Sequence, residues 1–145
     1  MRLLTVPKIV AATAVILSTV ALAQANTGVR LTASLDGASE VPGPGDPDGT
    51  GTASVRINPG QNQLCYSISV SNIAPATAAH IHEAAAGASG PVVTGLIAPT
   101  NGTSQACKTI SRELARDIVS RPSDYYVNVH NVAFPAGAVR GQLGR

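Results

Sequence analysis

The chain has 145 residues, 44% of them hydrophobic, with only 10 basic and 8 acidic side chains. Two of the basic residues, Arg2 and Lys8, lie in the N-terminal segment, so the remaining 8 (10 − 2) balance the 8 acidic residues. The rest of the chain therefore has no net charge with which to bind nucleic acid or an anionic membrane. Its length, about 120 residues, is enough for one domain with a single core.

The N-terminal segment has the features of a secretory signal peptide. An apolar run follows the two basic residues at 9–22, and small residues in an A-x-A pattern come next. The run is shorter than the roughly 20 residues that cross a bilayer as a helix. We therefore predict a signal peptide at 1–25, cleaved after Ala23 or Ala25, and an exported domain at 26–145. That domain would be secreted or periplasmic, with no membrane attachment after cleavage.

Cys65 and Cys107 are the only two cysteines. An even number of cysteines in an exported protein favours a disulfide over two buried free thiols. The bond would close a loop of roughly forty residues, and the loop-entropy relation assigns about 3–4 kcal/mol to such a closure.

Alternation of apolar and polar residues predicts strands through most of the exported domain. The expected strands are 29–35, 52–57, 64–71, 78–82, 91–97, 104–110, 125–130 and 138–143. The segment 59–62, Pro-Gly-Gln-Asn, predicts a hairpin turn between the second and third of them. Many short strands separated by glycine and proline indicate an all-β fold, an antiparallel sandwich or barrel of the immunoglobulin or superoxide dismutase type.

One segment departs from this alternation. Ile110, Leu114 and Ile118 recur every four residues, which is the spacing of one helix face. Ser111 stands where an N-cap is needed, and Pro122, four residues after Ile118, ends the pattern. We predict one short helix at 112–120.

All three histidines of the chain lie in two predicted strands. His80 and His82 are two residues apart and share one face, and His130 shares a face with Tyr126 and Asn128. If the two strands are neighbours, the three imidazoles converge and form a site for copper or zinc. The alternative is structural: imidazoles that hydrogen-bond to loop carbonyls and polar neighbours and so tie two strand ends together.

Four polar residues are placed to surround and orient these imidazoles: Glu83, Tyr126, Asn128 and Arg140. Arg140 has two further interpretations. It could guide anions to the histidines, or it could form an ion pair with Glu83 or Asp124, and the ion pair is the favoured interpretation.

Four blocks of the sequence resemble the CHRD domain, first described in chordin and found in many bacterial secreted proteins. They are residues 35–42, 79–82, 90–93, and 126–130 running on to 134–143. Glu83 stands where the family usually has glycine, and the loop after it is rich in alanine. The resemblance implies an all-β extracellular domain without established chemistry. In chordin such domains belong to a growth-factor-binding protein, which favours a binding module for an unknown protein or small ligand.

The segment from His80 to Glu83 is also similar to the copper-binding strand of copper–zinc superoxide dismutases. That similarity implies His130 as a third copper ligand and Arg140 as the arginine that guides the anion, although no fourth histidine is present to bridge to zinc. A copper-dependent redox protein is therefore one alternative function, and an envelope or matrix structural protein is another. No serine lies in a nucleophile-elbow pattern, and the CHRD resemblance implies no established chemistry, so a binding module is favoured over an enzyme.

Overall fold

Alternating burial organises the strands into one sheet with a buried inner face. The computed structural model describes residues 28–145, so the predicted signal peptide lies outside it. In β1, for example, Leu31, Ala33 and Leu35 are buried and the residues between them are exposed. The strands are β1 (Val29–Asp36), β2 (Thr50–Asn58), β3 (Gln63–Ser71), β4 (Ala76–Glu83), β5 (Val92–Leu96), β6 (Thr103–Thr109), β7 (Tyr125–Asn131) and β8 (Val139–Gln142).

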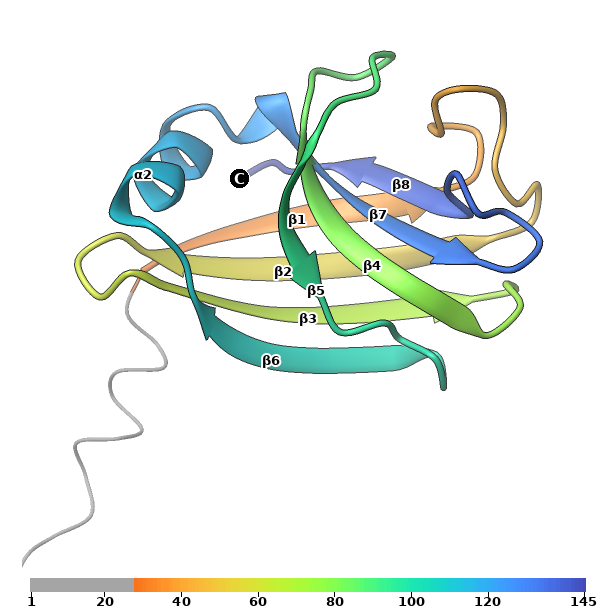
Figure 1. Cartoon of the computed structure of the whole chain (residues 1–145), viewed down its shortest axis with the longest axis horizontal. Helices are drawn as coiled ribbons and strands as arrows, with labels where there is room; N and C mark the ends of the chain where they lie inside the picture. Colours follow the sequence, from red (N-terminus) through yellow and green to blue (C-terminus); the bar gives the residue numbers. More distant parts are fainter. Residues whose placement is uncertain (1–27) are drawn as a thin grey trace, which may run out of the picture.

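The eight strands follow the order β5-β4-β7-β8-β1-β2-β3-β6, and every neighbouring pair is antiparallel. The two halves of the sheet meet where Asp36 of β1 pairs with Arg140 of β8. From this junction the sheet curls over itself, so that β4 and β7 pass in front of β1, β2 and β3 at an angle (Figure 1). The inner faces of both halves supply the hydrophobic core. The prediction of an all-β sandwich or barrel is confirmed, and a single curled sheet forms it.

No strand ladder joins the two ends of the sheet, β5 and β6, but side chains of β6 and of its neighbour β3 reach β5 and the residue after it. Lys108 Nζ donates to the Gly95 carbonyl at 2.7 Å, and the Tyr66 hydroxyl accepts the Ile97 N–H at 2.7 Å. The Lys108 contact supplies a donor to one carbonyl of the edge strand β5, which would otherwise present unpaired backbone groups to other chains.

The helix α2 (Arg112–Ser120) has the bounds that the sequence predicts. Ser111 caps it, since its hydroxyl accepts the Leu114 N–H at 3.1 Å, and Ala115 and Ile118 are buried against the core. A short 3-10 turn (Pro122–Asp124) then leads into β7. Of the residues described, none belongs to a helix long and apolar enough to cross a membrane.

Cys65 and Cys107 form the predicted disulfide. The two residues lie directly opposite each other on β3 and β6, at the outer face of the sheet. The bond therefore joins the last strand of the sheet to its neighbour, in addition to the backbone ladder.

Candidate metal centre

The three histidines lie on the outer face of two adjacent strands. β4 pairs with β7 so that Ala78 is opposite His130, His80 is opposite Asn128, and His82 is opposite Tyr126. Alternation then turns the intervening residues, including Ile81, Val127 and Val129, into the core, where each is fully buried. The outward residues of this register are His80, His82, Tyr126, Asn128 and His130.

This register brings the three imidazoles together. The ligand nitrogens of His80, His82 and His130 all lie within 4.8 Å of one another. The shortest separation joins His80 Nδ1 to His130 Nε2 at 3.1 Å, and all three side chains are half-buried. Nitrogens bound to one zinc ion at about 2.0–2.1 Å stand roughly 3.3 Å apart in a tetrahedron. The observed cluster is therefore close to the size of a three-nitrogen metal site.

Two loop carbonyls fix the orientation of two of the imidazoles. His82 Nδ1 lies 2.9 Å from the Gly90 oxygen, and His130 Nδ1 lies 3.0 Å from the Pro135 oxygen. A carbonyl oxygen only accepts, so each Nδ1 carries the ring proton and each Nε2 keeps its lone pair. His82 Nε2 is buried and has no hydrogen-bond partner among the described residues. Metal-binding histidines have this arrangement, in which the second ring nitrogen donates to a carbonyl.

The environment of His80 and His130 favours their neutral forms. Burial lowers the pKa of His80, and the nearby His130 and His82 lower it further. Burial also lowers the pKa of His130, which more than offsets the raising effect of its bond to the Pro135 carbonyl. A neutral imidazole has the lone pair that a metal requires, so both residues remain able to bind metal at neutral pH.

Comparison with known protein families places this geometry in context. Residues 31–143, nearly the whole described chain, match the family model for the CHRD domain. The chain belongs to the CHRD family. The predicted resemblance is thus confirmed, and all three histidines of the cluster lie within the matched part. No curated protein and no solved structure matches this CHRD domain.

The Tyr126 ring contacts two side chains, His82 and Arg140, from the strands on either side of β7. The His82 ring from β4 stacks on the Tyr126 ring with 4.8 Å between centroids and 11° between planes. Arg140 from β8 places its Cζ 3.4 Å from the centroid of the same ring. The Tyr126 hydroxyl also accepts the Gly90 N–H at 3.3 Å. The tyrosine of this CHRD domain therefore contacts His82 and the residue that orients His82.

Arg140 does not form the ion pair that the sequence favoured. Glu83 and Asp124 both face Arg121, at 3.6 Å and 2.8 Å. The reason is the strand alternation, which sends Glu83 to the opposite face of β4 from His82. Glu83 therefore points away from the histidine cluster and toward the end of α2.

The guanidinium of Arg140 is instead bound to backbone carbonyls. It donates to the Ala88 oxygen at 2.8 Å and to the Ala85 oxygen at 3.1 Å, and it also donates to Gln142 Oε1. The residue is only 1% exposed. An arginine held in this way is not free to receive an incoming anion.

Asn128 leads to a residue that the sequence analysis missed. Its Nδ2 donates to both carboxylate oxygens of Glu40, at 2.9 Å and 2.8 Å, rather than to an imidazole. Glu40 is 6% exposed and lies against Gly137, where φ is +152° and a Cβ atom would collide with the carboxylate. Burial raises the pKa of Glu40 to about 7, although the Asn128 bond and the charge of Arg140 act in the opposite direction.

Glu40 could have been noticed in the sequence. It is the one acidic residue at 39–42, within the first block that resembles the family, and a glycine- and proline-rich loop follows it. That the loop returns to β7 is not visible in the sequence, so its partner Asn128 was not predictable.

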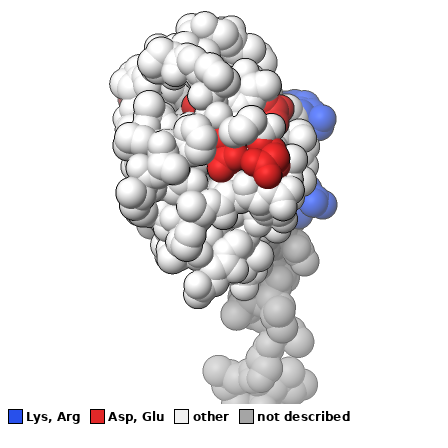
Figure 2. Space-filling model, turned by 90° about the vertical axis from the view of Figure 1, so that its right-hand side faces the viewer, with Lys and Arg blue, Asp and Glu red and all other residues white. Residues whose placement is uncertain are grey.

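One side of this CHRD domain, the right-hand side in Figure 1, carries few charged side chains. Figure 2 shows that face as mostly uncharged, with a central group of acidic atoms, a few further acidic atoms away from it, and basic atoms only at its edge. The view shows no broad basic patch, in keeping with the balanced charge of residues 26–145.

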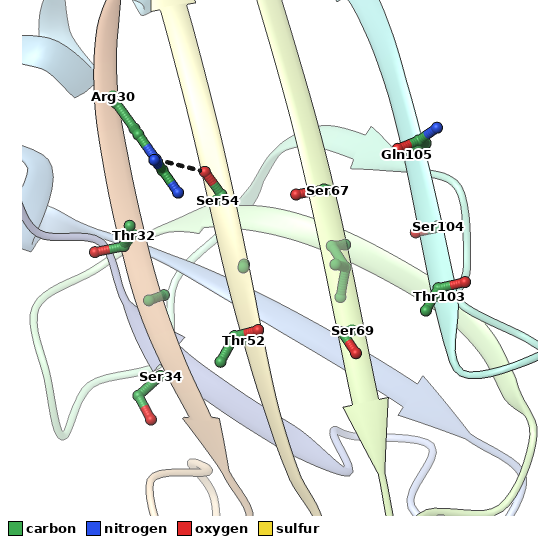
Figure 3. Close-up of a pocket in the computed structure, with 13 residues that line it drawn as sticks. Arg30, Thr32, Ser34, Thr52, Ser54, Ser67, Ser69, Thr103, Ser104 and Gln105 are labelled. Carbon is green, nitrogen blue, oxygen red and sulfur yellow. Dashed lines mark hydrogen bonds between the residues drawn. The ribbon is translucent and has the colours of Figure 1, made fainter.

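A separate hollow of about 940 Å³ lies on the outer face of β1, β2, β3 and β6. Its walls are mainly hydroxyl side chains in neighbouring rows, with Arg30 donating to Ser54 Oγ at 3.1 Å (Figure 3). Its lining includes no histidine, cysteine or acidic residue. It therefore has no set of groups for metal binding or acid–base chemistry, and the histidine cluster is the stronger candidate site.

Proposed function

We propose that this CHRD domain is an exported binding module that holds one copper or zinc ion through His80, His82 and His130. The observation that carries the proposal is the orientation of the imidazoles. Two separate loops hold the Nδ1 protons of His82 and His130, so neither Nε2 carries a proton. The Nε2 of His82 has no partner among the described residues, and the Nε2 of His130 faces His80 Nδ1 at 3.1 Å. The disulfide between Cys65 and Cys107 supports an oxidising compartment, either periplasmic or extracellular.

The chemistry of the donor set narrows the metal. Imidazole nitrogen suits copper and zinc, whereas calcium and magnesium prefer oxygen ligands. Three neutral ligands leave at least one coordination position for water or an exchangeable group. Such a position is what a binding module needs if the ion contacts a further ligand.

The polar residues around the cluster have different roles in this proposal. Tyr126 supports the His82 ring by stacking. Arg140 donates hydrogen bonds to the loop that carries the Gly90 carbonyl. Asn128 anchors the β1–β2 loop through Glu40, and Glu83 has no direct role because it faces Arg121.

Calorimetric titration of the purified protein with Cu(II) and Zn(II) tests the proposal. We expect one ion per chain, with micromolar or tighter affinity for at least one of the two metals. His82→Ala should lose most of that affinity because it removes a ligand. Glu83→Gln is the matched control: it changes the neighbouring residue, whose side chain faces away from the cluster, and should bind like the wild type. Absence of binding, or equal binding by His82→Ala, would contradict the proposal.

A copper-dependent redox role is the second candidate, because an all-imidazole site suits copper and copper brings redox chemistry that zinc does not. A superoxide assay on copper-loaded protein tests it. Activity above that of free copper, lost in His82→Ala, would establish the redox role. Metal binding without such activity would leave the binding module.

A further inference from the structure

We infer that Arg140 is a positioning residue that clamps the loop of residues 84–91, so that the Gly90 carbonyl holds His82 with its proton on Nδ1. The effect of this clamp on metal affinity rests on the proposed function. The hydrogen bond from His82 Nδ1 to the Gly90 carbonyl does not rest on the proposed function, because it forms without a metal ion.

The 84–91 loop has little packing of its own. It joins β4 to β5, and residues 85–89 are all exposed and mostly alanine or glycine. A loop without buried apolar side chains depends on hydrogen bonds for its conformation. Arg140 supplies two of them, from Nη1 to the Ala88 carbonyl and from Nη2 to the Ala85 carbonyl.

Arg140 can act as a clamp because it is itself held rigidly. Its guanidinium lies over the Tyr126 ring, and Gln142 Oε1 accepts from Nε at 3.3 Å and from Nη2 at 2.9 Å. The Gln142 amide in turn donates to the Ala84 carbonyl at 3.0 Å. The planar, multi-donor guanidinium matches two carbonyls at fixed spacing, which a lysine ammonium on a flexible stem does not.

Gly90 transmits the position of the loop to the imidazole. Its N–H donates to the Tyr126 hydroxyl, and its oxygen accepts from His82 Nδ1. It also lies so close to the Glu83 carbonyl that any Cβ atom would collide with it. Gly90 belongs to the clamped loop and contacts both Tyr126, the tyrosine under Arg140, and His82, the proposed ligand.

The consequence is a defined state of the His82 ring. With the carbonyl in place, the proton stays on Nδ1 and the Nε2 lone pair is available. If the loop moves, the proton can pass to Nε2 and block that lone pair. His130 provides an internal comparison, because its Nδ1 is held by Pro135 in a different loop, whereas the loop carbonyls to which Arg140 donates are those of Ala85 and Ala88.

Nitrogen-15 NMR of the metal-free protein, which distinguishes protonated from unprotonated ring nitrogens, tests the inference directly. In the wild type we expect His82 and His130 both to carry the proton on Nδ1, with slow solvent exchange. In Arg140→Lys, which keeps the charge, the Nδ1 proton of His82 should exchange at least tenfold faster or appear partly on Nε2, while His130 stays unchanged. Arg116→Met, on the exposed side of α2, is the matched control and should leave both rings unchanged.

A second variant keeps the test decisive if Arg140→Lys disturbs folding. Tyr126→Phe keeps the ring under Arg140 and removes only the hydroxyl that receives the Gly90 N–H. It should also loosen the His82 proton and leave His130 unaffected. Unchanged His82 in both variants, or equal changes in His82 and His130, would overturn the inference.

The metal titration separates the inference from the proposed function. If wild type binds metal, Arg140→Lys should bind about 10- to 100-fold more weakly, the usual cost of losing a group that orients a ligand. Unaltered affinity would overturn the link between the clamp and the metal. If wild type binds neither metal, the proposed function fails, and the NMR comparison alone decides whether the clamp exists.

Discussion

Glu40 is a carboxyl group that the fold buries beside a cation and an amide. The Asn128 amide faces both of its oxygens, and the charge of Arg140 lowers its pKa, yet burial dominates and raises the pKa to about 7. Near neutral pH the residue therefore titrates inside the folded protein. It joins the β1–β2 loop to β7, the strand that carries His130.

This burial predicts a dependence of stability on pH. Because the folded pKa is raised above the ordinary value of 4.5, the ionised form is the one that folding disfavours. The free energy of unfolding should be fully retained below about pH 4.5 and should fall by roughly 1–3 kcal/mol as the pH rises through 7. Urea denaturation of wild type and Glu40→Gln at a series of pH values tests this prediction. The difference between their free energies of unfolding, plotted against pH, gives the contribution of Glu40.

The comparison with the variant is needed because the histidines act in the opposite direction. The pKa values of His80 and His130 are lowered, so their protonation costs stability as the pH falls below their ordinary value. That contribution is common to both proteins and cancels in the difference. Glu113→Gln, an exposed acid on α2, is the control and should follow the wild type. Parallel curves for wild type and Glu40→Gln would contradict the prediction.

At the scale of the elements, the pairing of β3 with β6 depends on one covalent bond as well as on a ladder. β6 is the last strand of the sheet, so it has a neighbour on one side only. Cys65 and Cys107 are separated by 42 residues in sequence and lie opposite each other in this pair. Their bond constrains the unfolded chain over that distance.

Replacing both cysteines by serine should therefore lower the free energy of unfolding by about 3–4 kcal/mol, the value of the loop-entropy relation for a loop of this length. Urea denaturation of the double variant measures the loss. Ser67→Ala with Gln105→Ala is the matched control, since these residues face each other on the same two strands without a covalent bond. A cost in the control equal to that of the cysteine variant would show that the strand face, and not the bond, supplies the stability.

The elements that were predictable are those whose signal is local. α2 was predicted with its bounds because its cap, its four-residue repeat and the following proline all lie within one short segment. The shared face of His80 and His82 follows from strand alternation alone. The partners of Arg140 and Glu40 were not predictable, because they are set by where two loops return to the sheet. The ion pair expected for Arg140 was wrong for two reasons. Strand alternation turns Glu83 away from the histidine face, and Arg121 at the end of α2 pairs with both Glu83 and Asp124.

For the whole molecule, the curl of the sheet separates the core from the candidate site. The apolar face of each strand is turned inward, so the histidine face of β4 and β7 is turned outward, where two loops contact it. The covering loops, 84–91 and 131–138, each supply one carbonyl to one imidazole. The fold thus provides a half-buried cluster that lies outside the core.

X-ray absorption spectroscopy of the metal-loaded protein tests the central claim most directly, because it reports the ligands of the bound ion. We predict three imidazole nitrogens at about 2.0–2.1 Å and no sulfur, with one imidazole contribution lost in His82→Ala. A shell of oxygen ligands alone, a sulfur ligand, or a spectrum that His82→Ala leaves unchanged would contradict a three-histidine metal centre in this CHRD domain.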